Sequence, residues 1–555
     1  MIKSVKNNSP FNKIIFITLI FLGFIILNFI SSKLYSKFDL TSDKRYSLTE
    51  TTTNIVSNIK SPLLVKIYLE GDFPPEFKRL QLEIKQHLEQ INSLNKNISY
   101  SFINPLGKEK KLIKNGLKPS KLAIQEQGKT SQMVIFPWAT IIHKNKSINV
   151  SLLSSNAKTQ EAILQNSIEN LEFLFTDAIY KVTKDKKENI AVLTGNNELD
   201  FIYLDGLLKT LSQYYHLEPF PLDSANIIPQ KTLKLLNKFD LAIVAKPTKR
   251  FTENEKFTLD QFQANNGKTL WLIDNVIAEN DSLAKNGKNL ALNRELNLTD
   301  LFFNYGARVK YNLVKDLYSS TIKLASGNID GKTQYKDFLW HYYPLVNPNK
   351  EHVISKNIPA VQLKFASTID TLKNDIKKTI LLQSSPISKP YGIPLEYSFD
   401  EINSKPSKQN YNNGNKILGV LLEGEFKSAY KDRIQPFKIE NFIPISKPNK
   451  MILIADGDII KNEILQGKPL DLGIDKWTGI KNGNKEFLLN SIQYLLDDNG
   501  LLKLRSKNIK LRFLDKEKVY QENIFWQVIN IITPLLLLVV FGIAYTFYRR
   551  KKYSD

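Results

Sequence analysis

The chain has 555 residues, no cysteine and a formal net charge of +22. The absence of cysteine excludes disulfides, thiolate metal sites, iron–sulfur clusters and any cysteine nucleophile. The positive charge comes mostly from lysines spread evenly along the chain, without an arginine-rich stripe or an RNP-like aromatic motif, so no nucleic-acid partner is expected. This length predicts two or three soluble domains.

Two uncharged hydrophobic segments, 14–32 and 524–548, lie near the two ends of the chain. A helix needs about 17–25 apolar residues to cross the hydrocarbon core of a bilayer, so both segments are long enough. A cleavable signal peptide is the main alternative for the first segment. The residues after it contain no A-x-A cleavage site, which favours an uncleaved anchor.

Charge predicts the orientation of these segments. The tail 1–13 carries lysines and no acidic residue, and Arg549 opens a basic run in the tail 549–555. Positive residues beside membrane helices tend to stay in the cytoplasm. We therefore expect a protein of the bacterial inner membrane with two spans, two cytoplasmic tails and a large periplasmic body that contacts membrane lipid.

The first part of the body, 33–158, predicts a small α/β domain. A strand is expected at 63–70, followed by a helix that begins near Pro75 and then a second strand at 97–105. Further short strands follow it. This order is thioredoxin-like, but without a C-x-x-C motif the domain has no dithiol chemistry. The apolar face of the helix is expected to contain Phe77, Leu80, Ile84, Leu88 and Ile91.

Residues 159–310 predict the first part of a doubly wound α/β domain. A long helix at 159–181 has an apolar seam, and strands then alternate with helices, which is typical of a parallel sheet. Thr252 and Glu255 have the spacing of a capping box at the start of one of these helices.

The regular alternation of strand and helix patterns stops at 311–411. Short β-like runs lie there among Asn, Ser, Pro and Lys, so we expect a β-rich insertion. The second part of the doubly wound domain is expected at 412–500. A basic stalk, 501–523, then leads to the second hydrophobic segment.

Ligands of doubly wound sheets bind beyond the carboxyl ends of the strands. Carboxylates that converge there can bind a cation or act as acid and base. Asp, Asn and Gly are also the ordinary residues of strand-exit loops, so a purely structural role stays open. Lys246 follows one of the predicted strands, and the candidate ligand crevice consists of Gly195, Asn196, Glu198, Asp274, Asp456 and Asp458.

No catalytic, cofactor-binding or metal-binding residue is predicted. None of the five histidines forms an H-x-x-x-H pair, and the chain contains neither a phosphate-binding G-x-x-x-x-G-K-[ST] loop nor a G-x-S-x-G nucleophile elbow.

Several motifs, in order along the chain, resemble the GldG family, the auxiliary, substrate-binding-like component of the gliding-motility ABC transporter of Bacteroidota. The segment 311–411 carries none of these motifs. They are FDLTSDKRYSLT (38–49), YLEGDFPPEFKRLQ (68–81), INP (103–105), VLTGNNE (192–198), LIADGDIIKN (453–462) and the run from NKEFLL to RFLD (484–515).

The resemblance implies a non-enzymatic periplasmic subunit that works with a GldF-like permease and a cytoplasmic GldA-like ATPase. It also implies an amidotransferase-like fold for the doubly wound domain. The enzymes of that fold need a cysteine nucleophile, which this chain lacks, so their activity does not carry over. A membrane-tethered periplasmic ligand sensor or hydrolase that uses the strand-end carboxylates is the alternative.

The second hydrophobic segment contains Trp526, Asn530 and Pro534. Proline kinks a helix, and asparagine is costly to expose to lipid. A simple anchor needs neither, so we expect these residues to face the permease. The alternative is a tolerated kink with Asn530 near the lipid head groups.

Overall fold

The computed structural model describes residues 18–26, 28, 47–126, 129–153, 159–185, 188–280, 283, 287–356, 358–404, 406–496, 500–505 and 521–553. The predicted tail 1–13, much of the first predicted span and most of the predicted stalk lie outside these residues. Within the first span, residues 18–26 and 28 are helical and exposed.

The small domain near the N-terminus is built on a four-stranded sheet with the order β2-β1-β5-β6. Strand β1 pairs in parallel with β2 and antiparallel with β5, and β6 pairs antiparallel with β5. A separate hairpin joins β3 to β4. The strands are β1 (Leu63–Ile67), β2 (Ile98–Phe102), β3 (Ser120–Glu126), β4 (Lys129–Ile135), β5 (Trp138–His143) and β6 (Lys146–Ser151).

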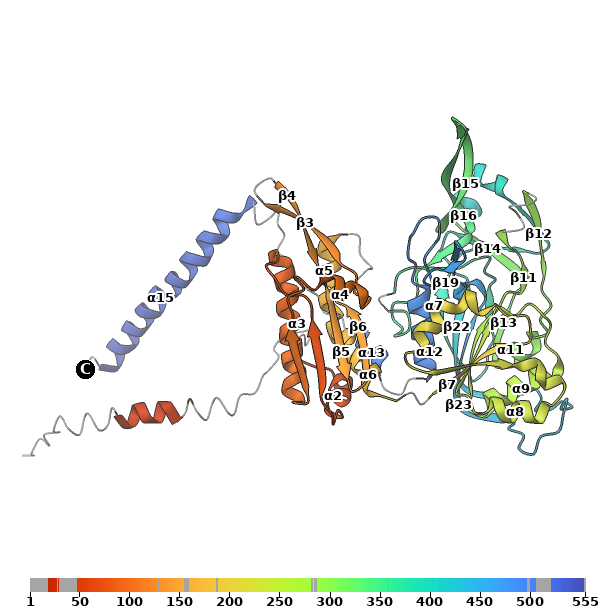
Figure 1. Cartoon of the computed structure of the whole chain (residues 1–555), viewed down its shortest axis with the longest axis horizontal. Coiled ribbons are helices and arrows are strands. Elements are labelled where there is room, and N and C mark those ends of the chain that lie inside the picture. The colour runs from red at the N-terminus through yellow and green to blue at the C-terminus, as the bar shows by residue number, and fades with distance from the viewer. Residues whose placement is uncertain are drawn as a thin grey trace, which may run out of the picture. The chain divides into compact units, whose positions relative to one another are not determined.

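Helices α2 (Glu50–Ser57), α3 (Pro75–Leu94) and α4 (Glu109–Lys114) belong to this domain (Figure 1). Helix α3 begins with a proline at its first position, where the missing N–H costs nothing. Its buried residues confirm the predicted apolar face without exception: Phe77, Leu80, Ile84, Leu88 and Ile91. The strand order is compatible with the thioredoxin-like assignment, which stays a prediction.

The helix predicted at 159–181 is divided in two. Helix α5 (Gln160–Glu169) ends at Asn170, and α6 (Leu171–Thr183) begins directly after it. Asn170 lies outside helical geometry (φ −95°, ψ 1°), so the helix axis is interrupted there. The predicted apolar face continues across this interruption. Its five residues are all buried: Leu164, Ile168, Leu171, Phe175 and Ala178.

The large domain is organised around a seven-stranded sheet with the order β19-β22-β23-β10-β9-β7-β8. The five strands from β23 to β8 are parallel. Strand β22 pairs antiparallel with β23, and β19 pairs antiparallel with β22, so β22 alone runs against the others and the sheet is mixed rather than wholly parallel. The strands are β7 (Asn189–Thr194), β8 (His216–Pro221), β9 (Leu241–Ala245), β10 (Lys268–Leu272), β19 (Lys377–Gln383), β22 (Ile417–Lys427) and β23 (Ile445–Ile454).

Both faces of this sheet are buried. Alternate residues of each strand enter two different clusters; for example, Val192 and Ile243 belong to one cluster, and Leu193 and Val244 to the other. Helices α7 (Phe201–Leu211) and α12 (Asn484–Leu496) cover the first face, and α8 (Pro229–Leu236), α9 (Glu253–Ala264) and α11 (Thr299–Tyr305) cover the second. The domain is therefore mixed α/β with helices on both sides of one sheet.

The segment predicted as a β-rich insertion contains many strands, among them β19, which belongs to the central sheet itself. Its longest element is the β15–β16 hairpin, which extends beyond the rest of the domain (Figure 1). The strands within it are β14 (Asn312–Asp316), β15 (Ser319–Ile329), β16 (Lys332–Val346), β17 (Val361–Gln362), β18 (Ile369–Thr371), β20 (Ser388–Gly392) and β21 (Leu395–Ser398).

Short elements complete the domain. They are β11 (Val276–Ile277), β12 (Lys288–Asn293), β13 (Ala307–Val309), β24 (Ile464–Leu465), β25 (Lys468–Pro469) and the 3-10 turns at Leu222–Asn226, Phe399–Asn403, Lys408–Asn410 and Asp458–Ile460. Helix α13 (Leu501–Arg505), at the start of the predicted stalk, contacts α6 and α12.

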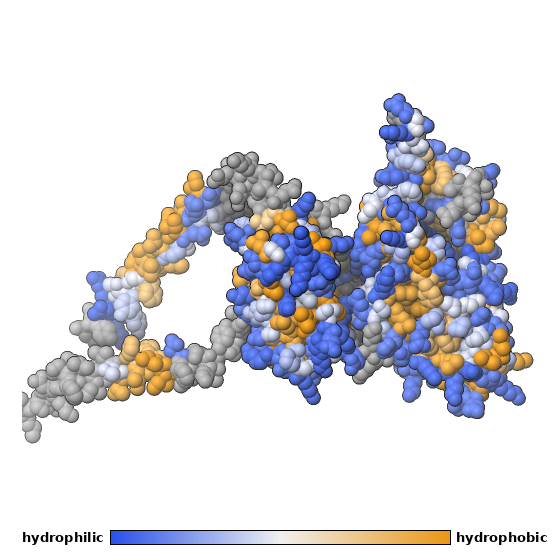
Figure 2. All heavy atoms as spheres, viewed as in Figure 1, coloured by the Kyte–Doolittle hydropathy of each residue, from blue (hydrophilic) through white to orange (hydrophobic). Residues whose placement is uncertain are grey.

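Helix α15 (Asn523–Tyr553) forms a separate unit near the C-terminus. Within the described residues, it is the one helix that is long and apolar enough to cross a membrane, judged by its length and composition. Its hydrophobic side chains are exposed along its length (Figure 2), as a bilayer-spanning helix requires.

Candidate functional site

The candidate site lies at the carboxyl ends of the parallel strands of the central sheet. Lys246 directly follows β9, Asp274 follows β10 by two residues, and Asp456 follows β23 by two residues. Because these three strands are parallel neighbours, their exits meet at one edge. Lys246 adopts a left-handed backbone conformation (φ 53°) at its strand exit.

A buried lysine ammonium occupies the middle of this group. Lys246 is only 4% exposed, and its Nζ lies 2.7 Å from Asp458 Oδ1 and 3.5 Å from Asp274 Oδ2. The half-exposed Glu279 adds a more distant oxygen, 3.9 Å from the same nitrogen. The cation that the converging carboxylates need is therefore supplied by the chain itself.

The carboxylates also accept backbone hydrogen bonds. Gly457 N donates to Asp274 Oδ1 (2.6 Å), Asp458 N donates to Asp456 Oδ1 (2.7 Å), and Lys364 N donates to Asp456 Oδ2 (2.7 Å). These bonds hold the turn after β23 and a segment from the predicted insertion against the strand exits.

Burial and neighbouring charge shift the pKa values of these groups in different directions. Burial raises the pKa of Asp274 and that of Asp456, and Asp458 raises both further; for Asp274, Lys246 opposes the rise. Burial alone would raise the pKa of Asp458, but Lys246 and Lys461 hold it below its ordinary value. Burial would lower the pKa of Lys246, yet Asp274 and Asp458 raise it above that of an ordinary lysine. The chief charged pair is thus Lys246 with Asp458.

The remaining predicted residues form a second group at the exit of β7. Asn196, which is fully buried, donates its side-chain amide to Glu255 Oε2 (3.0 Å) and its backbone N–H to Glu198 Oε2 (2.8 Å). Burial raises the pKa of Glu198. Gly195 has φ 115°, and an added Cβ would lie 2.8 Å from Asp223.

Glu255 also closes the predicted capping box of α9, which the structure confirms: its carboxylate accepts the Thr252 N–H (2.8 Å), and Thr252 Oγ1 accepts the Glu255 N–H (3.3 Å). The six predicted crevice residues therefore divide into two groups. In the aspartate group, Lys246 pairs with Asp274 and Asp458, while backbone N–H groups bind Asp456. In the β7-exit group, Asn196 donates hydrogen bonds to Glu255 and Glu198.

Sequence reasoning missed the contribution of the segment between β17 and β18. The backbone N–H of Lys364 donates a hydrogen bond to Asp456, and the Lys364 ammonium forms an ion pair with Glu463. Nothing in the local sequence marks these residues, because 92 positions separate Lys364 from Asp456 and 99 separate it from Glu463. Among the described residues, no group of three or more His, Asp or Glu side chains is arranged to hold a metal ion.

The three residues predicted to face a permease all lie on α15, four residues apart, and thus on one stripe of the helix. Asn530 is exposed, Pro534 lies inside the helix, and Trp526 Nε1 donates to Glu522 Oε2 (2.9 Å). Contact between this stripe and a permease stays a prediction.

Comparison with known proteins gives matches to both domains. A family described as an ABC-type uncharacterized transport system matches residues 187–491, and a domain of unknown function (DUF7088) matches residues 42–142. An uncharacterized protein of Borreliella burgdorferi is 21% identical over 564 residues, covering 99% of each chain. A solved structure titled mmIFT52 N-terminal domain aligns at 13% identity with a TM-score of 0.33, covering 56% of this chain and 99% of that one.

Proposed function

This chain belongs to the ABC-type uncharacterized transport system family, whose match covers more than half of its length, and we propose that it is a non-enzymatic, membrane-anchored periplasmic subunit of an ABC transporter that is required for gliding motility. Family membership makes it an auxiliary component of an ABC transport system. The gliding role, the two spans and the periplasmic location are parts of the proposal.

The observation that carries the non-enzymatic part is the position of Lys246. A general acid, a general base or a metal site needs carboxylates that are open to a substrate or an ion. Here the Asp274 and Asp458 carboxylates are directed at an internal ammonium and at backbone N–H groups. This arrangement favours a scaffold that ties the strand exits to the segment containing Lys364.

The proposed partners are a multi-span GldF-like permease and a cytoplasmic GldA-like ATPase. The resemblance of the sequence motifs to GldG supports them, together with membership of the transport family. In the same proposal the small domain is thioredoxin-like and the large domain amidotransferase-like. Neither brings its enzymatic chemistry, since the chain has no cysteine.

A variant in which the charged residues at the strand exits are replaced by uncharged ones tests the non-enzymatic role. The triple variant Lys246→Met, Asp274→Asn, Asp458→Asn removes the cation together with its two buried partners, so neither carboxylate is left buried without a counter-charge; its third neighbour, Glu279, is half-exposed. We expect cells that carry a folded triple variant to glide as the parent does. Loss of gliding at unchanged protein level and unchanged melting temperature would favour the ligand sensor or hydrolase instead.

Affinity purification tests the partners. The tagged native chain, solubilised from membranes, is expected to bring down a permease and an ATPase. The double variant Asn530→Leu, Pro534→Leu should insert into the membrane normally and recover less permease. Undiminished recovery would mean that α15 is only a tether.

Reporter fusions test the topology. Alkaline phosphatase fused after Lys60 should be active, and a fluorescent protein fused after Asp555 should fluoresce in the cytoplasm. An inactive phosphatase fusion would contradict a periplasmic body.

A further inference from the structure

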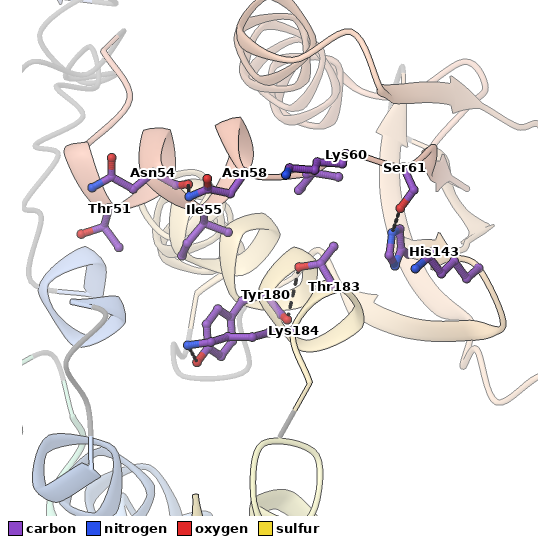
Figure 3. Close-up of a pocket in the computed structure, with 12 residues that line it drawn as sticks. Thr51, Asn54, Ile55, Asn58, Lys60, Ser61, His143, Tyr180, Thr183 and Lys184 are labelled. Carbon is purple, nitrogen blue, oxygen red and sulfur yellow. Dashed lines mark hydrogen bonds between the residues drawn. The ribbon is translucent and has the colours of Figure 1, made fainter. Parts of the chain in front are cut away.

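An open cavity of about 490 Å³ lies on the small domain, and none of the strand-exit residues described above lines it. One face of α2 lines it with Thr51, Asn54 and Asn58, and the C-terminal end of α6 lines it with Tyr180, Thr183 and Lys184 (Figure 3). The loop before β1, with Lys60 and Ser61, and the end of β5, with His143, complete it. Its volume lies in the range of small-ligand sites.

The charge of this cavity is one-sided. Its described lining contains Lys60, Lys144 and Lys184 but no Asp or Glu. Lys60 and Lys144 are exposed, and among the described residues neither lies within ion-pair distance of a carboxylate. The adjacent Asp185 pairs instead with Lys146 (3.3 Å). Like charges gathered in a concave surface attract an anion.

Lys184 is oriented by the aromatic ring beside it. Its Nζ donates to Tyr180 Oη (2.9 Å) and lies 4.7 Å from the centre of that ring. Figure 3 shows the two side chains together on the α6 side of the cavity. The Tyr180 ring and hydroxyl thereby fix the position of the ammonium.

A buried histidine fixes a hydroxyl group at the other end of the cavity. His143 is 7% exposed, with its Nδ1 lying 3.2 Å from Val182 O and its Nε2 lying 2.7 Å from Ser61 Oγ. A carbonyl can only accept, so Nδ1 donates to Val182 O, and in the neutral ring Nε2 accepts the hydroxyl proton of Ser61. Figure 3 shows this pair beside Lys60.

This pair is unlike the serine–histidine arrangement of hydrolases. In those enzymes a buried carboxylate behind the histidine stabilises the imidazolium that forms when the serine attacks. Here the atom behind His143 is a main-chain carbonyl, which carries no charge. The pair is better suited to hold Ser61 in place than to activate it as a nucleophile.

We propose that this cavity binds a phosphate-bearing ligand. Lysine ammonium groups are common phosphate partners, and the Thr51 hydroxyl and the Asn54 amide can donate further hydrogen bonds to phosphate oxygens. The phosphate belongs either to a lipid head group, which a chain with a membrane-spanning helix meets, or to a soluble phosphate ester.

Calorimetric titration of the full-length chain in a neutral detergent tests the proposal. Two soluble probes, inorganic phosphate and glycerol 3-phosphate, are compared with glycerol, and a third probe is dihexanoyl phosphatidic acid at concentrations below micelle formation, compared with dihexanoyl glycerol. We expect at least one phosphate-bearing probe to bind and both uncharged compounds not to bind. Tighter binding of the lipid assigns the head group as the natural source, and tighter binding of glycerol 3-phosphate assigns a soluble ester.

Matched variants locate the binding. The double variant Lys60→Gln, Lys144→Gln should weaken it at least about tenfold, because two charge-assisted contacts are lost. The control Lys110→Gln, Lys114→Gln removes the same charge from α4 of the same domain and should change the dissociation constant less than about twofold, as expected for charges that do not contact the ligand.

Asn54→Ala provides a second variant that leaves the net charge unchanged. It should weaken binding about three- to tenfold through the loss of one hydrogen bond. Melting temperatures show whether each variant is folded. The proposal is overturned if none of the phosphate-bearing probes binds, or if the α4 control loses as much affinity as the Lys60 and Lys144 double variant.

Discussion

Replacing Lys246 with methionine tests the reasoning about the strand exits most directly. At an effective dielectric constant of about 20, an ammonium 2.7 Å from Asp458 and 3.5 Å from Asp274 interacts with them by about 6 and about 5 kcal/mol. The cost of removing these charges from water offsets much of that attraction. Removing one partner of such a buried group leaves the carboxylates uncompensated, and we expect a net loss of about 3–5 kcal/mol of folding free energy.

Thermal unfolding of the full-length chain, followed by tryptophan fluorescence, measures this loss. Trp271 lies in β10 of the same sheet, is 1% exposed and packs between Phe251 and Phe302, so its emission reports on this domain. A loss of about 3–5 kcal/mol corresponds to a melting temperature lower by about 6–20 °C for a domain of this size.

The control is Lys209→Met, which breaks an ion pair of similar length at the surface, with Lys209 Nζ lying 2.8 Å from Asp205. The Lys209 side chain is 75% exposed, so its loss should cost less than about 1 kcal/mol. Equal, small effects of Lys246→Met and Lys209→Met would refute the view that the internal ammonium holds the strand exits together.

The pH dependence of the Lys246→Met variant supplies a second check. Asp274 and Asp456 have raised pKa values in the folded state, so their contribution to stability is present below about pH 3.8 and is lost as the pH rises through those values. Asp458, whose pKa is lowered, contributes in the opposite sense: its share is present above about pH 3.8 and is lost as the pH falls. Without the ammonium, the pKa of Asp458 should also rise. The deficit of the variant relative to the parent should therefore shrink between pH 8 and pH 5, and a deficit that grows on acidification would contradict this assignment.

Three further predictions concern the framework around the site, and each is measured as a change in unfolding free energy. Gly457→Ala should cost about 1–3 kcal/mol, because the added Cβ would lie 2.6 Å from Cγ of Lys246. The control Gly392→Ala, whose added Cβ would have no atom within 4 Å, should cost less than about 0.5 kcal/mol. Equal costs would contradict steric crowding at Gly457. Asp260→Ala should cost about 2–4 kcal/mol, because this buried carboxylate accepts hydrogen bonds from two side-chain hydroxyls and one backbone N–H, and these donors would be left unpaired. An unchanged stability would mean that water takes the place of the carboxylate. Thr252→Ala should cost about 1–2 kcal/mol by opening the capping box, and an unchanged stability would show that the rest of the structure fixes the start of α9.

The sequence by itself determined those elements that depend only on residues close together along the chain. The face of α3 from Phe77 to Ile91 is readable because apolar residues three and four apart share one side of a helix, whatever lies opposite. The capping box of Thr252 and Glu255 is readable because both of its hydrogen bonds close within four residues. The apolar length of α15 is readable because a bilayer imposes a minimum number of residues.

Only the tertiary structure decided how distant segments combine. The strand β19 lies in the predicted insertion yet completes an edge of the central sheet, because strand pairing depends on register between segments and not on local composition. The sequence placed Glu198 beside Asp274 and Asp456 at the strand exits, but in the structure Glu198 bonds to Asn196, and Lys246 pairs with Asp274 and Asp458. Which carboxylate meets which cation depends on loop geometry of a few ångströms, and electrostatic energy changes steeply over such distances. The lysine-lined cavity between α2 and α6 is of the same kind, since Lys60, Lys144 and Lys184 come together only when the domain folds.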